Sequence, residues 1–196
     1  MRSIYKIVVC SLLTLSITSC EKDLLEKEQY QKEIYLIGAY NRVWTTEVSY
    51  SNEEVKTYFT VSSSGTLALD RDVNVKMKIN EELVDIYNKK YWTVLNEDKY
   101  YKSLDTDLYS IPSLENTVIK HAEGISAEVP VLIKTASLKI DQSYVIPVEI
   151  ESTTGYPISE SGYKMLILLK LKNDYSGSYQ MSGHTTVSYT HLTLPT

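Results

Sequence analysis

The stretch Val73-Asn74-Val75-Lys76-Met77-Lys78-Ile79 decides the fold class of this chain. Its apolar and polar residues alternate strictly, which is typical of a β-strand with one buried face and one solvated face. The same period of two recurs from residue 34 onward, in residues 34–37, 55–62, 116–121, 127–133, 143–151 and 163–172. About seven or eight short strands separated by turns predict an all-β fold, an immunoglobulin-like antiparallel β-sandwich spanning residues 34–173.

Two segments depart from the simple strand pattern. Residues 80–88 place Leu83, Ile86 and Tyr87 at helical spacing, and Asn80 is a suitable N-cap, so we expect one short amphipathic helix between two strands. Pro147 lies inside the predicted strand at residues 143–151. Because proline cannot donate a ladder hydrogen bond, this strand is predicted to lie at a sheet edge or to carry a bulge.

Composition excludes several functional classes. The chain has 196 residues with 20 Lys+Arg and 25 Asp+Glu, and this net charge of -5 argues against nucleic-acid binding. Two cysteines cannot form a disulfide scaffold or a four-ligand zinc site. The three histidines, His121, His184 and His191, are too few and too scattered for most metal chemistry. We therefore predict no metal and no cofactor.

The N-terminus has the pattern of an export signal over residues 1–19. Arg2 and Lys6 precede an apolar run at residues 7–17, which is too short to span a bilayer. The following Ile17-Thr18-Ser19-Cys20 resembles the lipobox of bacterial lipoproteins. That resemblance implies a diacylglycerol on Cys20, which would hold the protein to outer-membrane lipid. An ordinary signal peptide that ends near a cysteine is the alternative.

The charged residues after Cys20 predict an exposed tether over residues 20–33. Their position resembles the surface-export signal of Bacteroidota lipoproteins, which implies an outer-membrane protein facing the cell exterior. A plain solvated tether is the alternative, and it leaves the choice between the periplasmic and the outer face open.

The C-terminal residues have two separate interpretations. Residues 174–186 look like the truncated start of a second β-domain. Residues 187–196 resemble the conceptual translation of sequencing-adapter read-through, which would make them a non-native tail. A genuine C-terminal strand is the alternative for this last segment.

No motif in the sequence supports catalysis. The paired acids at 53/54, 70/72, 81/82 and 105/107 fit solvated turns better than a glycosidase pair. Asp70 with Asp72, or Asp105 with Asp107, lacks the remaining ligands of a recognisable calcium loop. A Gly-x-Ser-x-Gly elbow and a phosphate-binding glycine loop are both absent. We therefore predict no catalytic residue and a protein that is not an enzyme.

Aromatic residues are the remaining functional signal. The chain has 17 Tyr and a single Phe. Trp92, Tyr100 and Tyr101 crowd into the irregular segment at residues 89–116, and Trp44 is expected in the loop after the first strand. Aromatic rings in loops on a rigid sandwich suit stacking on sugar rings, so these four residues are candidate glycan contacts. Structural packing is the alternative role.

Several segments taken in order also carry a family resemblance. These are Val73-Asn74-Val75-Lys76-Met77-Lys78-Ile79 running into residues 82–88, then residues 91–101, 117–124, 126–133 and 144–148. They resemble an immunoglobulin-like N-terminal domain of unknown function in Bacteroidota outer-membrane lipoproteins from glycan-utilisation loci. In that family the domain precedes a second β-domain or a family-18-type endo-glycosidase.

The resemblance implies a non-catalytic surface domain that assists glycan binding or presentation in polysaccharide utilisation. Its implied partners are complex glycans or other surface utilisation proteins. Two alternatives stay open from the sequence: the spacer domain of a truncated endo-glycosidase, and a structural or adhesion module.

Overall fold

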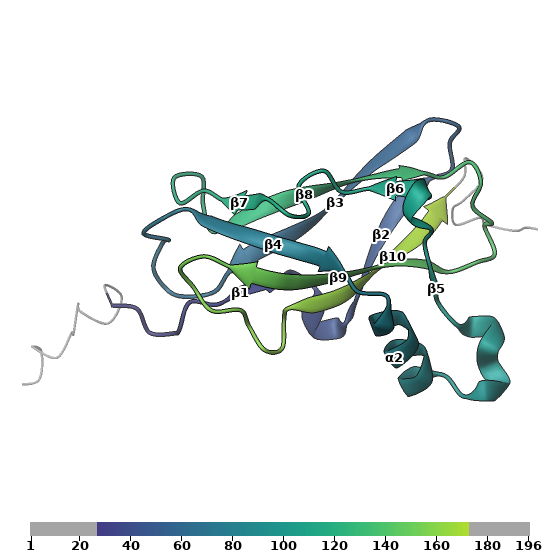
Figure 1. Ribbon diagram of the computed structural model, residues 1–196, viewed down its shortest axis with the longest axis horizontal. Helices are drawn as coiled ribbons and strands as arrows, with labels where there is room; N and C mark the ends of the chain where they lie inside the picture. The colour runs from purple at the N-terminus through teal and green to yellow at the C-terminus, as the bar shows by residue number, and fades with distance from the viewer. Residues whose placement is uncertain (1–26, 173–196) are drawn as a thin grey trace, which may run out of the picture.

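The computed structural model describes residues 27–172, where ten strands form two sheets packed face to face (Figure 1). One sheet has the order β1 (Ile34–Leu36), β3 (Glu54–Ser63), β8 (Ser126–Lys134) and β6 (Tyr109–Ser110). The other has the order β2 (Val43–Ser49), β10 (Lys164–Lys172), β9 (Tyr144–Thr153), β4 (Val73–Ile79) and β7 (Thr117–Ile119), and β5 (Lys102–Ser103) also pairs with β9. The predicted all-β sandwich is confirmed.

Several sequence predictions fall on residues that the structure does not describe. These are the signal peptide, Cys20, the first part of the tether, the start of a second domain, and the tail at residues 187–196. They stay predictions.

The core lies between the two sheets and follows the alternation in the sequence. In β4 the side chains of Val73, Val75 and Met77 are buried, whereas the intervening polar side chains are exposed. Phe59 of β3 lies in the same core from the opposite sheet. Because each strand contributes every second residue to one continuous apolar layer, a shift by one residue would expose that strand's core side chains.

Pro147 lies in an inner strand, so the predicted edge position is wrong. β9 is paired with β10 on one side and with β4 and β5 on the other. β4 pairs only as far as Val148, and β5 begins its pairing with β9 at Tyr144 and Val145. Pro147 therefore lies in the gap between two neighbouring strands, where no ladder donor is needed. Its carbonyl accepts the backbone N–H of Asn80 at 3.1 Å. A register shift in β9 does occur, opposite Lys76 and Met77, away from Pro147.

The sandwich is not wholly antiparallel. β2 pairs in parallel with β10 along its full length, and Trp44 lies beside Ile167 in that pairing. Trp44 is thus on an edge strand, not in the loop that the sequence predicted. The ring packs over Gly38, where an added Cβ would lie 2.5 Å from the Trp44 ring. Gly38 also has a φ of 89°, so both the conformation and the space favour glycine there.

The predicted helix is present as α2 (Glu82–Tyr91), but its buried face differs from the expected one. Leu83, Val84 and Asn88 are buried, whereas Ile86 is 54% exposed. The N-cap is Glu81 and not Asn80 as predicted. Asn80 lies one residue earlier, where its carboxamide oxygen accepts the N–H of Glu82 at 3.2 Å. A polar residue, Asn88, takes part of the inward face, which hydrophobic periodicity alone does not predict.

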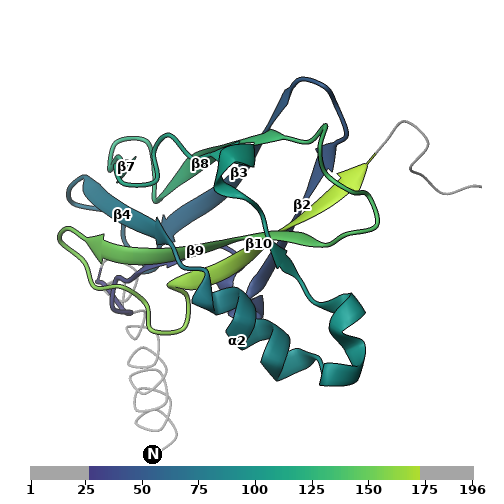
Figure 2. The same ribbon diagram turned by 45° about the vertical axis from the view of Figure 1, so that its right-hand side comes forward.

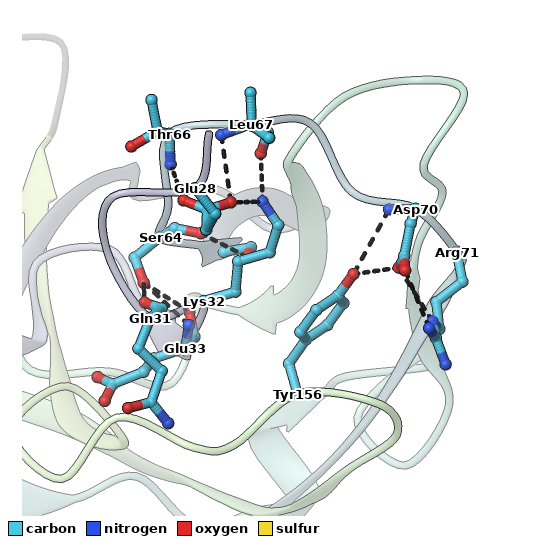
Figure 3. Close-up of polar contacts among 11 residues, drawn as sticks. Glu28, Gln31, Lys32, Glu33, Ser64, Thr66, Leu67, Asp70, Arg71 and Tyr156 are labelled. Atoms are coloured by element: carbon cyan, nitrogen blue, oxygen red, sulfur yellow. Dashed lines mark hydrogen bonds and ion pairs between the residues drawn. The ribbon is translucent and has the colours of Figure 1, made fainter. Parts of the chain in front are cut away.

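The segment before β1 is held against the loop between β3 and β4 (Figure 3). The Glu28 carboxylate accepts backbone N–H groups from Thr66 and Leu67 and forms an ion pair with Lys32. Lys32 in turn donates to the carbonyl of Leu67. Gly65 leaves room for Lys32, because an added Cβ would lie 2.8 Å from the Lys32 side chain. These contacts fix the point at which the predicted tether meets the domain.

This contact should respond to acid. The Lys32 ammonium, followed by the Thr66 N–H, lowers the pKa of Glu28 from 4.5 to about 2. Because the folded pKa is depressed, the stabilisation is present above pH 4.5 and is lost as the pH falls towards about 2. We expect the protection factor of the Thr66 amide, which is the intrinsic exchange rate divided by the observed rate at each pH, to fall across that window. Glu28→Gln should show the lower protection factor already at neutral pH and lose the pH dependence, whereas Glu53→Gln should behave like the parent. Unchanged protection in Glu28→Gln would contradict this role.

Candidate functional site

A lobe formed by α2 and the 3₁₀ segment Val94–Lys99 projects from one face of the sandwich (Figures 1 and 2). Leu83 and Val84 attach the helix to β9 and β10, where they pack with Val145 and Leu166. Partly buried neighbours complete this second, smaller core: Val43, Tyr87, Tyr101 and Leu168. The lobe is therefore attached to the sandwich by its own apolar contacts and is not a loose loop.

Asn88 ties the two ends of the lobe together. Its side-chain oxygen accepts the backbone N–H of Tyr101 at 3.0 Å, and its side-chain nitrogen donates to the Tyr101 carbonyl at 2.9 Å. Asn88 is only 5% exposed. This pair of hydrogen bonds fixes the return of the chain from Val94–Lys99 to β5, and so the positions of Tyr100 and Tyr101.

Trp92 and Tyr100 lie together in a surface pocket on this lobe. The pocket has a volume of about 390 Å³, within the usual range for small-molecule sites, and Tyr91, Thr93, Lys89 and Lys90 complete its lining. The Lys99 ammonium lies 5.8 Å from the centre of the Trp92 ring. The indole N–H of Trp92 is buried and has no partner among the described residues. The pocket below is called the aromatic pocket.

The other two candidate residues lie elsewhere. The Tyr101 ring stacks on Tyr87, with ring centres 5.3 Å apart and an interplanar angle of 11°. Burial, and then Tyr101, raise the pKa of Tyr87. Trp44 aligns with Ile167, which faces the core between the sheets, whereas the lobe packs on the outer face of β9 and β10. The structure thus groups Trp92 with Tyr100 and separates them from Trp44 and Tyr101.

A larger cleft, of about 610 Å³, lies beside β5 and is mainly polar. Its lining includes Asp105, Asp107 and Glu81, together with Ser103 and Tyr144. In residues 27–172, however, no three His, Cys, Asp or Glu side chains are grouped so that they could hold a metal ion. The aromatic pocket offers several flat rings for stacking, whereas the polar cleft offers a single aromatic ring, Tyr144.

The other charged groups singled out by the sequence are paired locally. Asp70 bonds to Arg71 and to the Tyr156 hydroxyl, and these contacts hold the pKa of Asp70 below its ordinary value (Figure 3). His121 meets Asp72 with 2.6 Å between the ring Nδ1 and the carboxylate, which lowers the pKa of Asp72. The Asp70–Tyr156 and Asp72–His121 contacts each join the loop before β4 to another exposed loop.

The structure thus defines an immunoglobulin-like sandwich that carries an aromatic lobe on one face. A family model described as a "-like, N-terminal domain" matches residues 30–157, which is 128 of the 196 residues. The chain belongs to this family of N-terminal domains, as its resemblance predicted. No curated protein matches the chain. No helix within residues 27–172 has the length and apolar character needed to cross a membrane.

Solved structures of Bacteroides proteins share the fold. An auxiliary nutrient binding protein from Bacteroides thetaiotaomicron has a TM-score of 0.57 at 16% identity, covering 71% of this chain and 47% of its own. A Bacteroides ovatus multidomain protein that includes DUF1735 has a TM-score of 0.56 at 20% identity, covering 70% and 43%. EndoBT-3987 from Bacteroides thetaiotaomicron, solved with a Man5GlcNAc product, has a TM-score of 0.51 at 20% identity, covering 70% and 30%.

These similarities establish the fold of the chain. The chain spans about half or less of each of these three proteins, so each of them contains further protein beyond the shared domain.

Proposed function

We propose that this chain is a non-catalytic, lipid-anchored surface domain that binds glycans for polysaccharide utilisation. The single observation that carries the proposal is the grouping of Trp92 and Tyr100 in one open pocket on a well-anchored lobe. Flat aromatic rings with polar edges suit the alternating apolar faces and hydroxyl rims of sugar rings. Two structural relatives support this choice, since one is described as a nutrient binding protein and another holds a Man5GlcNAc product.

The placement of the lobe fits an anchored protein. In both views the segment before β1 lies to the left, whereas α2 lies below β9 and β10 with the Val94–Lys99 segment to its right (Figures 1 and 2). A lipid on Cys20 would attach the chain through that segment. The aromatic pocket would then lie on a part of the molecule away from the attachment, where a soluble polysaccharide can reach it.

The test is glycan binding by the full chain, measured on a glycan array and then by calorimetry. Trp92→Ala and Tyr100→Ala should each weaken binding at least about tenfold, because central aromatic side chains commonly carry most of the binding energy. Tyr58→Ala is the matched control, since Tyr58 is an exposed aromatic residue of β3 in the other sheet. Folded protein that binds nothing on the array, or variants that bind like the parent, would refute the proposal.

The similarity to EndoBT-3987 favours a second candidate, the spacer domain of a longer enzyme. In that case the catalytic residues would lie in protein that follows the sandwich. The uninterrupted gene would decide between the two: a downstream domain that alternates strands and helices and carries clustered acids favours the enzyme, and further β-strands favour the binding protein.

A further inference from the structure

A small second hollow adjoins the aromatic pocket on the lobe. It has a volume of about 50 Å³ and shares Lys90 and Tyr91 with that pocket. The buried side chains of Leu83 and Leu166 contribute to its lining from α2 and β10. Two further cationic residues line it: Arg42, which directly precedes β2, and Lys164, the first residue of β10. The aromatic pocket therefore continues into an apolar hollow bordered by three cations.

Within the described part of the chain, the cations around this hollow have no protein counter-ion. The lining residues of the two pockets include no aspartate or glutamate, and Arg42, Lys90 and Lys164 form no ion pair within residues 27–172. Lys164 lies opposite Glu149 in the sheet, but that carboxylate accepts from Asn80 at 2.6 Å and faces Lys78 at 3.8 Å.

The other strand lysines fall into two groups. Four of them, Lys76, Lys78, Lys170 and Lys172, each pair with a glutamate, whereas Lys56, Lys102 and Lys134 form no ion pair within residues 27–172.

Lys89 also lines the aromatic pocket, so the linings of the two pockets together hold four cations and no acid. The acids of the lobe, Glu82, Asp85, Glu97 and Asp98, lie outside these linings. The positive charge is therefore confined to the pocket lining, where it favours an anion.

The backbone conformation of Arg42 is a second observation at this hollow. Its φ is 62°, and in the described residues no other non-glycine residue has a positive φ. Glycine or asparagine adopts this conformation at a lower cost, so an arginine here is unexpected from backbone preference alone. Its backbone serves the fold, since the carbonyl accepts the N–H of Leu166 at 2.8 Å, but glycine could make that bond as well. The guanidinium is thus the part that the backbone role does not explain.

We propose that the bound glycan is acidic, with a carboxylate or sulfate group held by Arg42, Lys90 and Lys164 while its sugar rings contact the aromatic pocket. This inference rests on the proposed glycan binding and names the class of glycan. A guanidinium binds carboxylate and sulfate oxygens through paired N–H groups, and the two lysines add charge without a fixed geometry.

The test uses two matched pairs of polysaccharides on the full chain. Polygalacturonate is compared with its methyl ester, and dextran sulfate with dextran, so that each pair differs only in charge. We expect the acidic member of at least one pair to bind at least about tenfold more tightly than its neutral partner. The pair that responds distinguishes a carboxylate from a sulfate. Polyglutamate, a polyanion without sugar, should bind no better than the neutral polysaccharides.

Variants then locate the anion. Arg42→Gly and Lys90→Gln should each weaken binding of the acidic polysaccharide about tenfold, and Arg42→Gly should keep the parent melting temperature because glycine suits that φ. Lys56→Gln removes the same charge from the other sheet and should leave binding unchanged. Equal binding of acidic and neutral partners would overturn the acidic class and leave the proposed function standing. Absence of all glycan binding would overturn both, and an equal loss in Lys56→Gln would overturn the assignment to this hollow.

Discussion

A chain carrying Cys20→Ala is expected to take up no labelled palmitate and to leave the membrane fraction entirely. The thiol of Cys20 is the proposed attachment point for the lipid, and alanine offers no nucleophile in its place. Each buried methylene of an acyl chain contributes about 0.8 kcal/mol to membrane binding, so the loss of the acyl chains removes the anchor completely. The measurement is palmitate labelling and fractionation in a bacterial host that processes lipoproteins.

Cys10→Ala is the matched control for this experiment. Cys10 lies within the predicted signal peptide, so its replacement should leave labelling and fractionation unchanged. If Cys20→Ala were labelled like the parent, the lipoprotein assignment would be wrong. Protease treatment of intact cells then separates the two faces of the outer membrane: a surface protein is digested, whereas a periplasmic one is protected.

The sequence predicts the strands well where one face of a strand is buried and the other is solvated. The alternation in residues 73–79 reappears in β4 as a strict succession of buried and exposed side chains. β2 was missed because it is an edge strand in which only Val48 is fully buried, so its alternation is weak. Its parallel pairing with β10 joins residues far apart in the chain, and no local sequence pattern predicts such a pairing.

Pro147 shows a different limit of sequence reasoning. The rule that proline avoids inner strands is physically sound, but it concerns a missing donor and not the strand as a whole. Here β4 ends and β5 begins on either side of that one position, with the helical lobe inserted between them. The donor is not needed at this gap, and the gap depends on tertiary structure that a single sequence does not reveal.

The sequence predicted only part of the candidate site. The crowding of aromatic residues at positions 89–116 pointed to Trp92 and Tyr100, which the structure does bring together. The cationic hollow was missed because Arg42, Lys90 and Lys164 come from three segments distant in sequence. A positive φ at Arg42 is a backbone property with no signature in the residue type. Local crowding can be read from a sequence, whereas convergence of distant charges cannot.

Asn88→Ala is expected to destabilise the protein by about 2–6 kcal/mol and to weaken glycan binding as well. The substitution leaves the N–H and the carbonyl of Tyr101 without their side-chain partners. Each unsatisfied buried polar group costs about 1–3 kcal/mol, and water that enters to replace the lost bonds would bring the total towards the lower end. Because Tyr100 precedes Tyr101 directly, the aromatic pocket should lose its fixed shape. Chemical denaturation gives the stability change, and calorimetry with the bound glycan gives the affinity.

Asn96→Ala provides the control within the same lobe. Asn96 donates to the Thr93 hydroxyl at 3.0 Å, a bond within one turn whose atoms are close to solvent. Its loss should cost less than about 1 kcal/mol, since water can replace it. If the two variants unfolded at the same denaturant concentration, Asn88 would not be the anchor of the lobe. If Asn88→Ala were destabilised but bound glycan like the parent, the aromatic pocket would keep its shape without the Asn88–Tyr101 bonds. The apolar contacts of Leu83 and Val84 would then be what holds the pocket in place.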